Sequence, residues 1–345
     1  MPDNFSKNSS LLTLNLNNNK LEGPFPRSLA FCDQLQILDV GENKIEGTFP
    51  NWLEGLPKLE VLILSNNKFN GAITSSKTKH PFLKLRIFDI SSNYFNGPLP
   101  EAYIKEFKGM MKIDNVETGW LYMENRIDPL YQYSVMVNMK GNVMELVKIL
   151  KIFTTLDLSN NEFDGQIPKV IGELYLLKGL NFSHNRITGS IPQSMGNLTN
   201  LECLDLSWNK LVGEIPSTMT NLNFLAILNL SQNKLEGIIP RGKQFNTFSE
   251  DSYVGNSGLC GVPLTKSCNK DEGKLPQLES SSTFDFGWKP VAIGYGCGMI
   301  FGISMGYIVF LIGKPQWLVN AFGGQSKRQR KKTRNRARAN QRRMN

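Results

Sequence analysis

The sequence predicts an α/β-type repeat solenoid, in which short coils stack side by side and share a parallel sheet. Three observations predict it. A motif that reads approximately LxxLxLxxNxLxGxIP occurs eight times between Leu11 and Pro240. The copies lie 24, 24 and 26 residues apart in a first block, and 24 residues apart throughout a second block. An Asn occupies the ninth position of every copy.

A fixed period in this range is typical of leucine-rich repeats, whose coils bury their apolar edges only by stacking. Each copy opens with a short strand such as residues 204–206, whose leucines point inward because strand side chains alternate. The Gly of the motif permits a turn with positive φ, and the Pro prevents a helix from continuing. The copies begin at Leu11, Leu35, Leu59, Leu85, Phe153, Leu177, Leu201 and Leu225.

The recurring Asn is expected to point inward and to pair with backbone groups of neighbouring coils. A buried polar group without a partner costs about 1–3 kcal/mol, so each Asn should be satisfied. The sequence therefore predicts a ladder along the solenoid, formed by Asn19, Asn43, Asn67, Asn93, Asn161, Asn185, Asn209 and Asn233.

The concave sheet of such a solenoid serves as an extended binding surface. Most outward side chains on it are simply solvated, but an exposed Trp on a strand is costly to leave in water. We therefore take Trp208 and His184 as candidate ligand contacts. The outward positions of the sixth and seventh copies are Lys178, Gly179, Asn181, Ser183, His184, Glu202, Cys203, Asp205, Ser207 and Trp208.

The repeat stops over residues 101–151, between four coils in 1–100 and four more in 152–240. A structureless loop of this length would be unusual within a compact domain. Disordered inserts are polar and poor in aromatic residues, whereas this one contains apolar side chains that can pack on the solenoid. The sequence predicts a folded island domain, with a strand over 133–140 and a short helix or strand over 145–151. Those side chains are Trp120, Tyr122, Tyr131, Tyr133 and Met136.

Residues 241–270 are predicted to cap the last coil, because repeat proteins need a terminal cap. Cys260 and Cys268 lie eight positions apart in this Gly- and Pro-containing segment. In an extracellular protein they are expected to form a disulfide, and the alternative is two thiols. Cys32 and Cys203 lie inside repeats and are expected to be buried thiols.

Residues 290–313 contain no charged side chain over 24 positions. As a helix they extend about 36 Å, which exceeds the ~30 Å hydrocarbon core of a bilayer. Trp288 and Trp317 flank the segment, as aromatic residues do at membrane interfaces. The sequence predicts a transmembrane helix after a juxtamembrane stretch at 271–289. Three overlapping GxxxG units on one face predict pairing with another helix, through Gly294, Gly298, Gly302 and Gly306.

The last segment, residues 314–345, contains 11 Lys and Arg and no acidic residue, which leaves 28 basic and 30 acidic residues elsewhere. A nucleic-acid-binding tail is one interpretation. Directly after a membrane span, a cytosolic tail on anionic lipid is favoured, with the solenoid outside the cell. Glycosylation sequons at Asn181, Asn197 and Asn229 fit this topology, and others occur at Asn4 and Asn8.

With repeats, island, the cap sequence GNSGLCGVPLTKSC, one span and a basic tail in this order, the chain resembles the carboxy-terminal part of plant receptor-like proteins. These are leucine-rich-repeat receptors at the cell surface that lack a kinase domain, and the IP ending resembles the plant extracellular subclass. The resemblance implies an extracellular peptide, protein or glycan ligand, and a role mostly in defence, with some members in development.

The resemblance also implies partners. An adaptor receptor kinase would bind the GxxxG face, and a co-receptor kinase of the somatic-embryogenesis type would dock at the last repeats and the island. Tyr131 followed by Lys140 and Gly141 resembles the family's Tyr-x8-Lys-Gly motif. By that likeness, these three residues contribute to ligand-dependent contact with the co-receptor.

The start of the chain departs from this family, because the polar residues 1–4 run directly into a coil without an apolar signal segment. We expect an amino-terminal truncation, and a solenoid that stays cytosolic is one outcome of it. The alternatives are a developmental receptor-like protein, a binder similar to inhibitors of secreted hydrolases, and a non-functional or decoy truncation.

No catalytic constellation is found in the sequence. The two histidines, His80 and His184, lie in different coils and are too few for a catalytic triad or most metal sites. We therefore expect no enzymatic activity, no metal and no cofactor.

Overall fold

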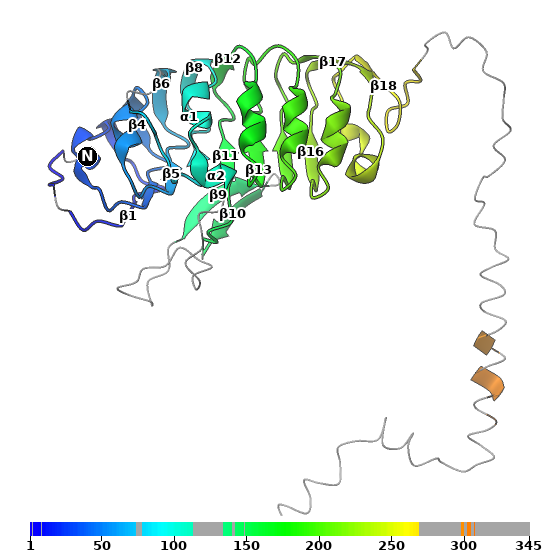
Figure 1. The fold of residues 1–345 in the computed structure, drawn as a ribbon, viewed down its shortest axis with the longest axis horizontal. Helices are drawn as coiled ribbons and strands as arrows, with labels where there is room; N and C mark the ends of the chain where they lie inside the picture. The colour runs from blue at the N-terminus through cyan, green and yellow to red at the C-terminus, as the bar shows by residue number, and fades with distance from the viewer. Residues whose placement is uncertain are drawn as a thin grey trace, which may run out of the picture. The chain divides into compact units, whose positions relative to one another are not determined.

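The computed structural model describes residues 1, 3–7, 9–73, 78–112, 134–139, 142–147, 149–268, 298–299, 302–304 and 307. The chain divides into two units, Met1–Lys270 and Asp271–Asn345. The stacked coils make up the first unit (Figure 1).

One short strand from each predicted copy contributes to the main sheet, which has eight parallel strands within the described residues. Neighbouring strands align leucine with leucine, as Leu180 does with Leu204. This arrangement confirms the predicted solenoid. In sheet order the strands are β1 (Thr13–Asn15), β3 (Ile37–Asp39), β5 (Val61–Ile63), β7 (Ile87–Asp89), β11 (Thr155–Asp157), β13 (Gly179–Asn181), β14 (Cys203–Asp205) and β16 (Ile227–Asn229).

Smaller parallel sheets form where the LxGxIP part of each repeat turns away from the main sheet. Gly165, Gly189 and Gly213 have φ of 71°, 74° and 78° there, as predicted. One sheet comprises β12 (Glu162–Asp164), β8 (Tyr94–Pro98), β6 (Lys68–Ala72), β4 (Lys44–Gly47) and β2 (Glu22–Pro24). The other comprises β15 (Val212–Gly213), β17 (Lys234–Ile238) and β18 (Gly258–Cys260).

Short 3-10 helices complete the coils, and most begin directly after the Pro of the motif, as η4 does after Pro192. Their apolar side chains close the main core against the leucines of the sheet, with Leu29, Leu53 and Met195 fully buried. The 3-10 helices are η1 (Arg27–Phe31), η2 (Asn51–Gly55), η3 (Lys169–Glu173), η4 (Gln193–Asn197), η5 (Ser217–Asn221), η6 (Lys243–Thr247) and η7 (Glu250–Ser252).

The predicted Asn ladder is present from Asn43 onward, whereas Asn19 is exposed and donates only to Leu16 O and Asn17 O of its own coil, which corrects the prediction for that residue. Asn43 is typical: its Nδ2 donates to the carbonyl oxygens of Leu16, Val40 and Gly41, and its Oδ1 accepts from the amide of Leu21. The ladder runs one coil further than the sequence predicted. Asn256 Nδ2 donates to Leu230 O at 3.0 Å and Tyr253 O at 2.8 Å, and Asn256 Oδ1 accepts from Leu235 N at 3.0 Å.

The insertion divides into two parts. Helices α1 (Glu101–Ile104) and α2 (Lys108–Met111) bury Tyr103 and Phe107 in the main core. Residues 101–111 therefore belong to the fourth coil, which corrects the predicted start of the island at residue 101. Strands β9 (Val135–Met139) and β10 (Asn142–Leu146) form an antiparallel hairpin, so the returning segment is a strand that begins before residue 145.

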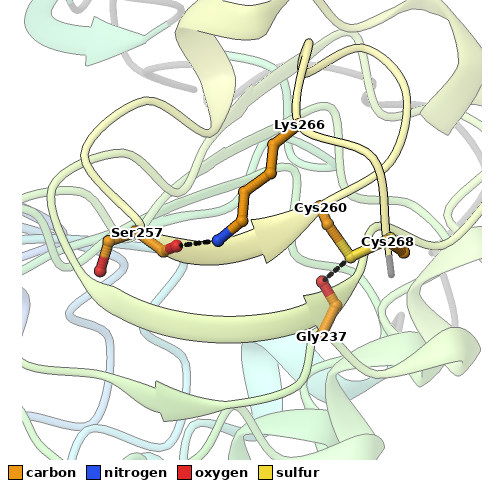
Figure 2. Close-up of a disulfide and its surroundings, with 5 residues drawn as sticks. All are labelled: Gly237, Ser257, Cys260, Lys266 and Cys268. Atoms are coloured by element: carbon orange, nitrogen blue, oxygen red, sulfur yellow. Dashed lines mark hydrogen bonds between the residues drawn. A yellow bond between two sulfur atoms is a disulfide. The ribbon is translucent and has the colours of Figure 1, made fainter. Parts of the chain in front are cut away.

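The cap contains the disulfide between Cys260 and Cys268, whose Cα atoms lie 5.1 Å apart (Figure 2). Lys266 Nζ donates to Ser257 O at 2.7 Å, which ties the segment between the two cysteines back to β18. The cap thus continues the stacking of the coils instead of leaving β17 as an open edge. Cys32 and Cys203 lie buried outside this disulfide.

Among the residues that the structure describes, no helix has the length and apolar character needed to cross a membrane. Most of 290–313, with Gly294 and Gly306, lies outside the described residues. Gly298 and Gly302 are described in short helical pieces and are exposed. The basic tail also lies outside the described part of the chain.

Candidate functional site

The β9–β10 hairpin covers part of the main sheet. Val135 and Val137 are 2% and 3% exposed, and they pack on a second apolar cluster apart from the main core. In Figure 1 the hairpin lies on the strand side of the coils. It therefore occupies the outer face of the first block. The sheet residues in this cluster are Ile37, Val61, Ile63 and Ile87, and Ile149 joins them from the end of the insertion.

Arg86 joins the two ends of the insertion. Its Nη1 donates to Gly109 O at 3.3 Å and to Lys151 O at 2.7 Å, and its Nε lies 3.3 Å from Glu60 Oε2. Arg86 is 9% exposed. Burial raises the pKa of Glu60, and the charge of Arg86 opposes that shift. The pair fixes where the chain leaves the solenoid and where it returns.

The second block leaves its outer sheet face uncovered by the hairpin, and a hollow of about 520 Å³ lies there. Three of the strands beneath it begin with small residues, Thr155, Gly179 and Cys203, whereas β16 begins with Ile227 and β3, β5 and β7 begin with Ile or Val. We call this feature the polar hollow. Its lining consists of Ser92, Thr155, Ser159, Asn160, Gly179, Leu180, Asn181, Ser183, His184, Cys203, Asp205, Ile227 and Asn229.

Carboxylates and amides alternate along the main sheet at Asp157, Asn181, Asp205 and Asn229; the last three line the polar hollow, whereas Asp157 is buried and does not. Asn181 Nδ2 donates to Asp157 Oδ2 at 3.1 Å, and Asn229 Nδ2 donates to Asp205 Oδ2 at 3.3 Å. The Oδ1 atom of each of these four side chains accepts from the backbone N–H two residues later. The hollow therefore offers the amides of Asn181 and Asn229 and the carboxylate of Asp205, all held in fixed positions.

Two carboxylates meet where the sheet crosses the insertion, because Asp89 on β7 lies opposite Asp157 on β11. Burial, and next to it the charge of Asp89, raise the pKa of Asp157 to about 7. Burial likewise raises the pKa of Asp89 and of Asp39. This acidic pair was not recognised in the sequence, because the two residues lie 68 positions apart and become neighbours only through the insertion.

His184 lines the polar hollow and Trp208 stacks on His184; we call these two residues the rim of the hollow. Their rings stack with centroids 5.5 Å apart and planes inclined by 17°, and Trp208 is 54% exposed. Both residues follow their strands in a left-handed turn, which corrects the expectation of a Trp on a strand. The eighth residue of every copy has φ between 51° and 56°: Asn18, Glu42, Asn66, Ser92, Asn160, His184, Trp208 and Gln232.

Several of the other predicted outward residues are less accessible than expected. Ser183 and Ser207 are buried, and Ser207 Oγ donates to Asp205 Oδ1 at 2.6 Å. Gly179 and Cys203 are also buried, as part of the floor. The expectation of an outward side chain is therefore wrong for Ser207, whereas Ser183, although 6% exposed, still lines the polar hollow. Lys178 and Glu202 form an ion pair across two coils.

The predicted co-receptor motif, Tyr131, Lys140 and Gly141, lies outside the described residues. The position of the hairpin was missed, although the sequence carries a signal for it. The fifth residue of every copy is Asp or Asn except in the third copy, where Ile63 stands. An apolar side chain at a position that is polar in all the other copies indicates that another part of the chain covers it.

Comparison with known proteins identifies relatives along most of the chain. Leucine rich repeat family models match residues 10–32, 33–95 and 153–211. Receptor-like protein 9DC3 of Solanum pimpinellifolium is 56% identical over 319 residues, which are 91% of this chain and 37% of that protein. Receptor-like protein 34 of Arabidopsis thaliana is 44% identical, over 94% of this chain and 34% of its own.

Among solved structures, the plant peptide hormone receptor RGFR1 in complex with RGF2 matches with a TM-score of 0.54 and 25% identity. The match covers 72% of this chain and 33% of that one. The chain thus spans little more than a third of the length of these relatives.

Proposed function

This chain belongs to the plant receptor-like proteins built from leucine-rich repeats, and we propose that it is part of a kinase-less cell-surface receptor. In this proposal the first unit binds an extracellular ligand. Signalling then passes through partner receptor kinases, in plant defence. The chain contributes binding surfaces and no catalytic group.

The observation that carries this proposal is the polar hollow with its rim of His184 and Trp208. Its polar side chains are already held by hydrogen bonds to neighbouring side chains and to backbone amides, so binding there costs little additional conformational entropy. The exposed indole adds a large contact surface at the edge, where Trp is frequently an anchor of binding energy. The structurally similar plant peptide hormone receptor RGFR1 was solved in complex with RGF2. This similarity favours a peptide or protein ligand over a glycan.

Membrane attachment and partner choice rest on the sequence. The uncharged stretch 290–313 is long enough to span a bilayer, and the basic residues after it favour a cytosolic tail at the plasma membrane. The GxxxG face is proposed to hold an adaptor receptor kinase. The last repeats and the island, with Tyr131, Lys140 and Gly141, are proposed to contact a co-receptor kinase.

The ligand part of the proposal is tested with exposed aromatic residues. The full chain, delivered to the plant cell surface, is challenged with culture filtrates of leaf pathogens, and the oxidative burst is measured. Trp208→Ala and His184→Ala should abolish a response that Tyr94→Ala retains. Tyr94 is the matched control because it is 57% exposed but lies on β8, away from the main sheet. Equal loss in all three variants would overturn the assignment of the site.

The partner part is tested by capture from plant membranes. A receptor kinase should co-purify with the chain and be lost when Gly294, Gly298, Gly302 and Gly306 are replaced by Leu. Capture that survives these replacements would overturn pairing through the span. A tag at each end, with protease protection, measures the topology; a protected solenoid and an accessible tail at the cytosolic side are expected.

A further inference from the structure

The polar hollow has an unbalanced charge. Among the described residues, its lining contains one carboxylate, that of Asp205, and no lysine or arginine. The neighbouring copies place amides at the same repeat position, Asn181 and Asn229, which carry no charge. Lys178, which directly precedes β13, does not compensate, because its Nζ already pairs with Glu202. A ligand in the hollow therefore meets a single fixed negative charge.

The carboxylate of Asp205 has an acceptor position left for a ligand. Its Oδ1 accepts from Ser207 N at 2.9 Å and from Ser207 Oγ at 2.6 Å. Within the described residues, its Oδ2 accepts from one donor, Asn229 Nδ2, at 3.3 Å. A carboxylate has about four acceptor positions, so Oδ2 can accept one more hydrogen bond. Asp205 is half-buried and lines the hollow, which makes this position accessible from there.

Asp157 shows the contrast between a structural and an accessible carboxylate at this repeat position. It is 4% exposed, does not line the hollow, and its Oδ2 accepts from Asn181 Nδ2. A cationic group of a ligand can therefore pair with Asp205 and not with Asp157.

The surroundings of Asp205 suit a long basic side chain. Ile227 lies beside Cys203 in the sheet register, lines the hollow and is 39% exposed. Lysine and arginine bury their methylene stems on such apolar surfaces while their charged ends pair with acids. The exposed indole of Trp208 follows Asp205 by three residues on the same coil. Because a planar guanidinium both pairs with a carboxylate and stacks on an aromatic ring, arginine fits better than lysine.

We propose that Asp205 determines the specificity of the polar hollow, and that the ligand contributes an arginine whose guanidinium donates to Asp205 Oδ2. The stem of this arginine packs on Ile227, and Trp208 adds a cation–π contact. The inference rests on the proposed function, because it assigns a chemical class to the ligand of the same site. An acidic residue of a ligand is disfavoured there, since two negative charges would meet in a partly desolvated hollow.

The test measures binding of short peptides to the full chain in nanodiscs of neutral lipid. The hollow takes its floor from β11, β13, β14 and β16, and strands about 4.8 Å apart give it a length of about 14 Å. An extended peptide covers that length with about four residues. The probes are therefore acetylated and amidated pentapeptides of glycine with arginine, citrulline, lysine or glutamate at the centre. Citrulline keeps the shape of arginine but has no charge.

Ligand-observed NMR gives the dissociation constants. The arginine peptide should bind wild type about fivefold to tenfold more tightly than the citrulline peptide, and the glutamate peptide should bind most weakly. Asp205→Asn should remove the preference for arginine and leave the affinity for citrulline nearly unchanged. Asp164→Asn is the matched control, because Asp164 is exposed on β12, outside the main sheet, and should keep the preference.

A salt titration of wild type needs no variant and is decisive even if Asp205→Asn folds poorly. Screening by salt should weaken the arginine peptide and not the citrulline peptide. Equal affinities of the two peptides for wild type, or a preference that survives Asp205→Asn, would overturn the role of Asp205. Peptides that bind without preference but are lost in Trp208→Ala would overturn that role alone and retain the hollow as the ligand site. Failure of every peptide to bind would overturn the hollow itself as a peptide site.

Discussion

Replacing Asp89 by Asn tests the acidic pair at the point where the sheet crosses the insertion. Asp89 Oδ1 accepts from Ser91 N at 2.9 Å and from Ser91 Oγ at 2.6 Å. Asn229 makes the same two bonds to Ser231, at 3.2 and 2.7 Å. An amide therefore fits this repeat position without losing either bond. What Asp89→Asn removes is the negative charge opposite Asp157.

The magnitude follows from the pKa of Asp157, which burial and the charge of Asp89 raise from 3.8 to about 7. One pKa unit corresponds to about 1.36 kcal/mol, so the ionised Asp157 costs the folded state about 4 kcal/mol. The pKa of Asp157 is higher in the folded state than in the unfolded state. Its contribution to stability is therefore fully present below about pH 4, where Asp157 is protonated in both states, and is lost as the pH rises to about 7. Burial persists in the variant. The charge is the second cause, so Asp89→Asn should gain about 1–2 kcal/mol at pH 8 and little at pH 4.5.

The assay is urea unfolding of residues 1–270 at both pH values. Asp205→Asn is the matched control, because Asp205 occupies the same position of its repeat. Its Oδ2 accepts from Asn229 Nδ2, and an amide in its place would face another amide. The control should lose about 1–2 kcal/mol at both pH values. If Asp89→Asn loses as much stability at pH 8 as the control, the charge of Asp89 adds nothing to the effect of burial on the pKa of Asp157.

Three further predictions concern single contacts. Asn209→Ala leaves the buried amide of Ile187 without its acceptor at 2.9 Å and should cost about 2–4 kcal/mol in urea unfolding, against about 0.5 kcal/mol for the exposed Asn19→Ala; equal losses would contradict the ladder argument. Arg86→Met leaves Glu60 without its ionic partner, should cost about 3–5 kcal/mol, and should raise hydrogen exchange in 134–147 but not in the second block. Replacing both cap cysteines by Ser removes the disulfide between residues eight positions apart and should lower the free energy of unfolding by about 2–3 kcal/mol. Reductant should then have no further effect on the variant.

The repeat part of the fold is predictable because every coil obeys the same physical constraints. The leucines at fixed spacing determine which side chains are buried, and the ninth-position Asn determines where each coil turns. Asn43 and its equivalents bond to the coil before them, so one motif specifies both the coil and its stacking. The same logic would have extended the ladder to Asn256, but the cap lacks the leucine pattern that identifies the other copies.

The described part of the island was predictable as a strand but not in its position. Alternation indicates a strand near residues 133–140, yet nothing local indicates which surface that strand covers. The answer depends on Ile37, Ile63 and Ile87, which lie in other repeats, and of these only Ile63 departs from the residue types of the other copies. The polar hollow was missed for a related reason. Its volume comes from the small side chains of Gly179 and Cys203. A sequence pattern indicates which side chains are present, but it does not directly indicate the empty space between them.

The two blocks of coils share one backbone plan and differ in what their outer faces can bind. In the first block, apolar residues at the strand positions of β3, β5 and β7 are already covered by Val135 and Val137. In the second, small residues and the Asp157–Asn181 and Asp205–Asn229 pairs replace them. An apolar hairpin placed there would bury those carboxylates and amides further without offering them partners, at several kcal/mol. Within the described residues the hairpin lies on the first block, and the polar hollow of the second block is the surface on which we propose that the ligand binds.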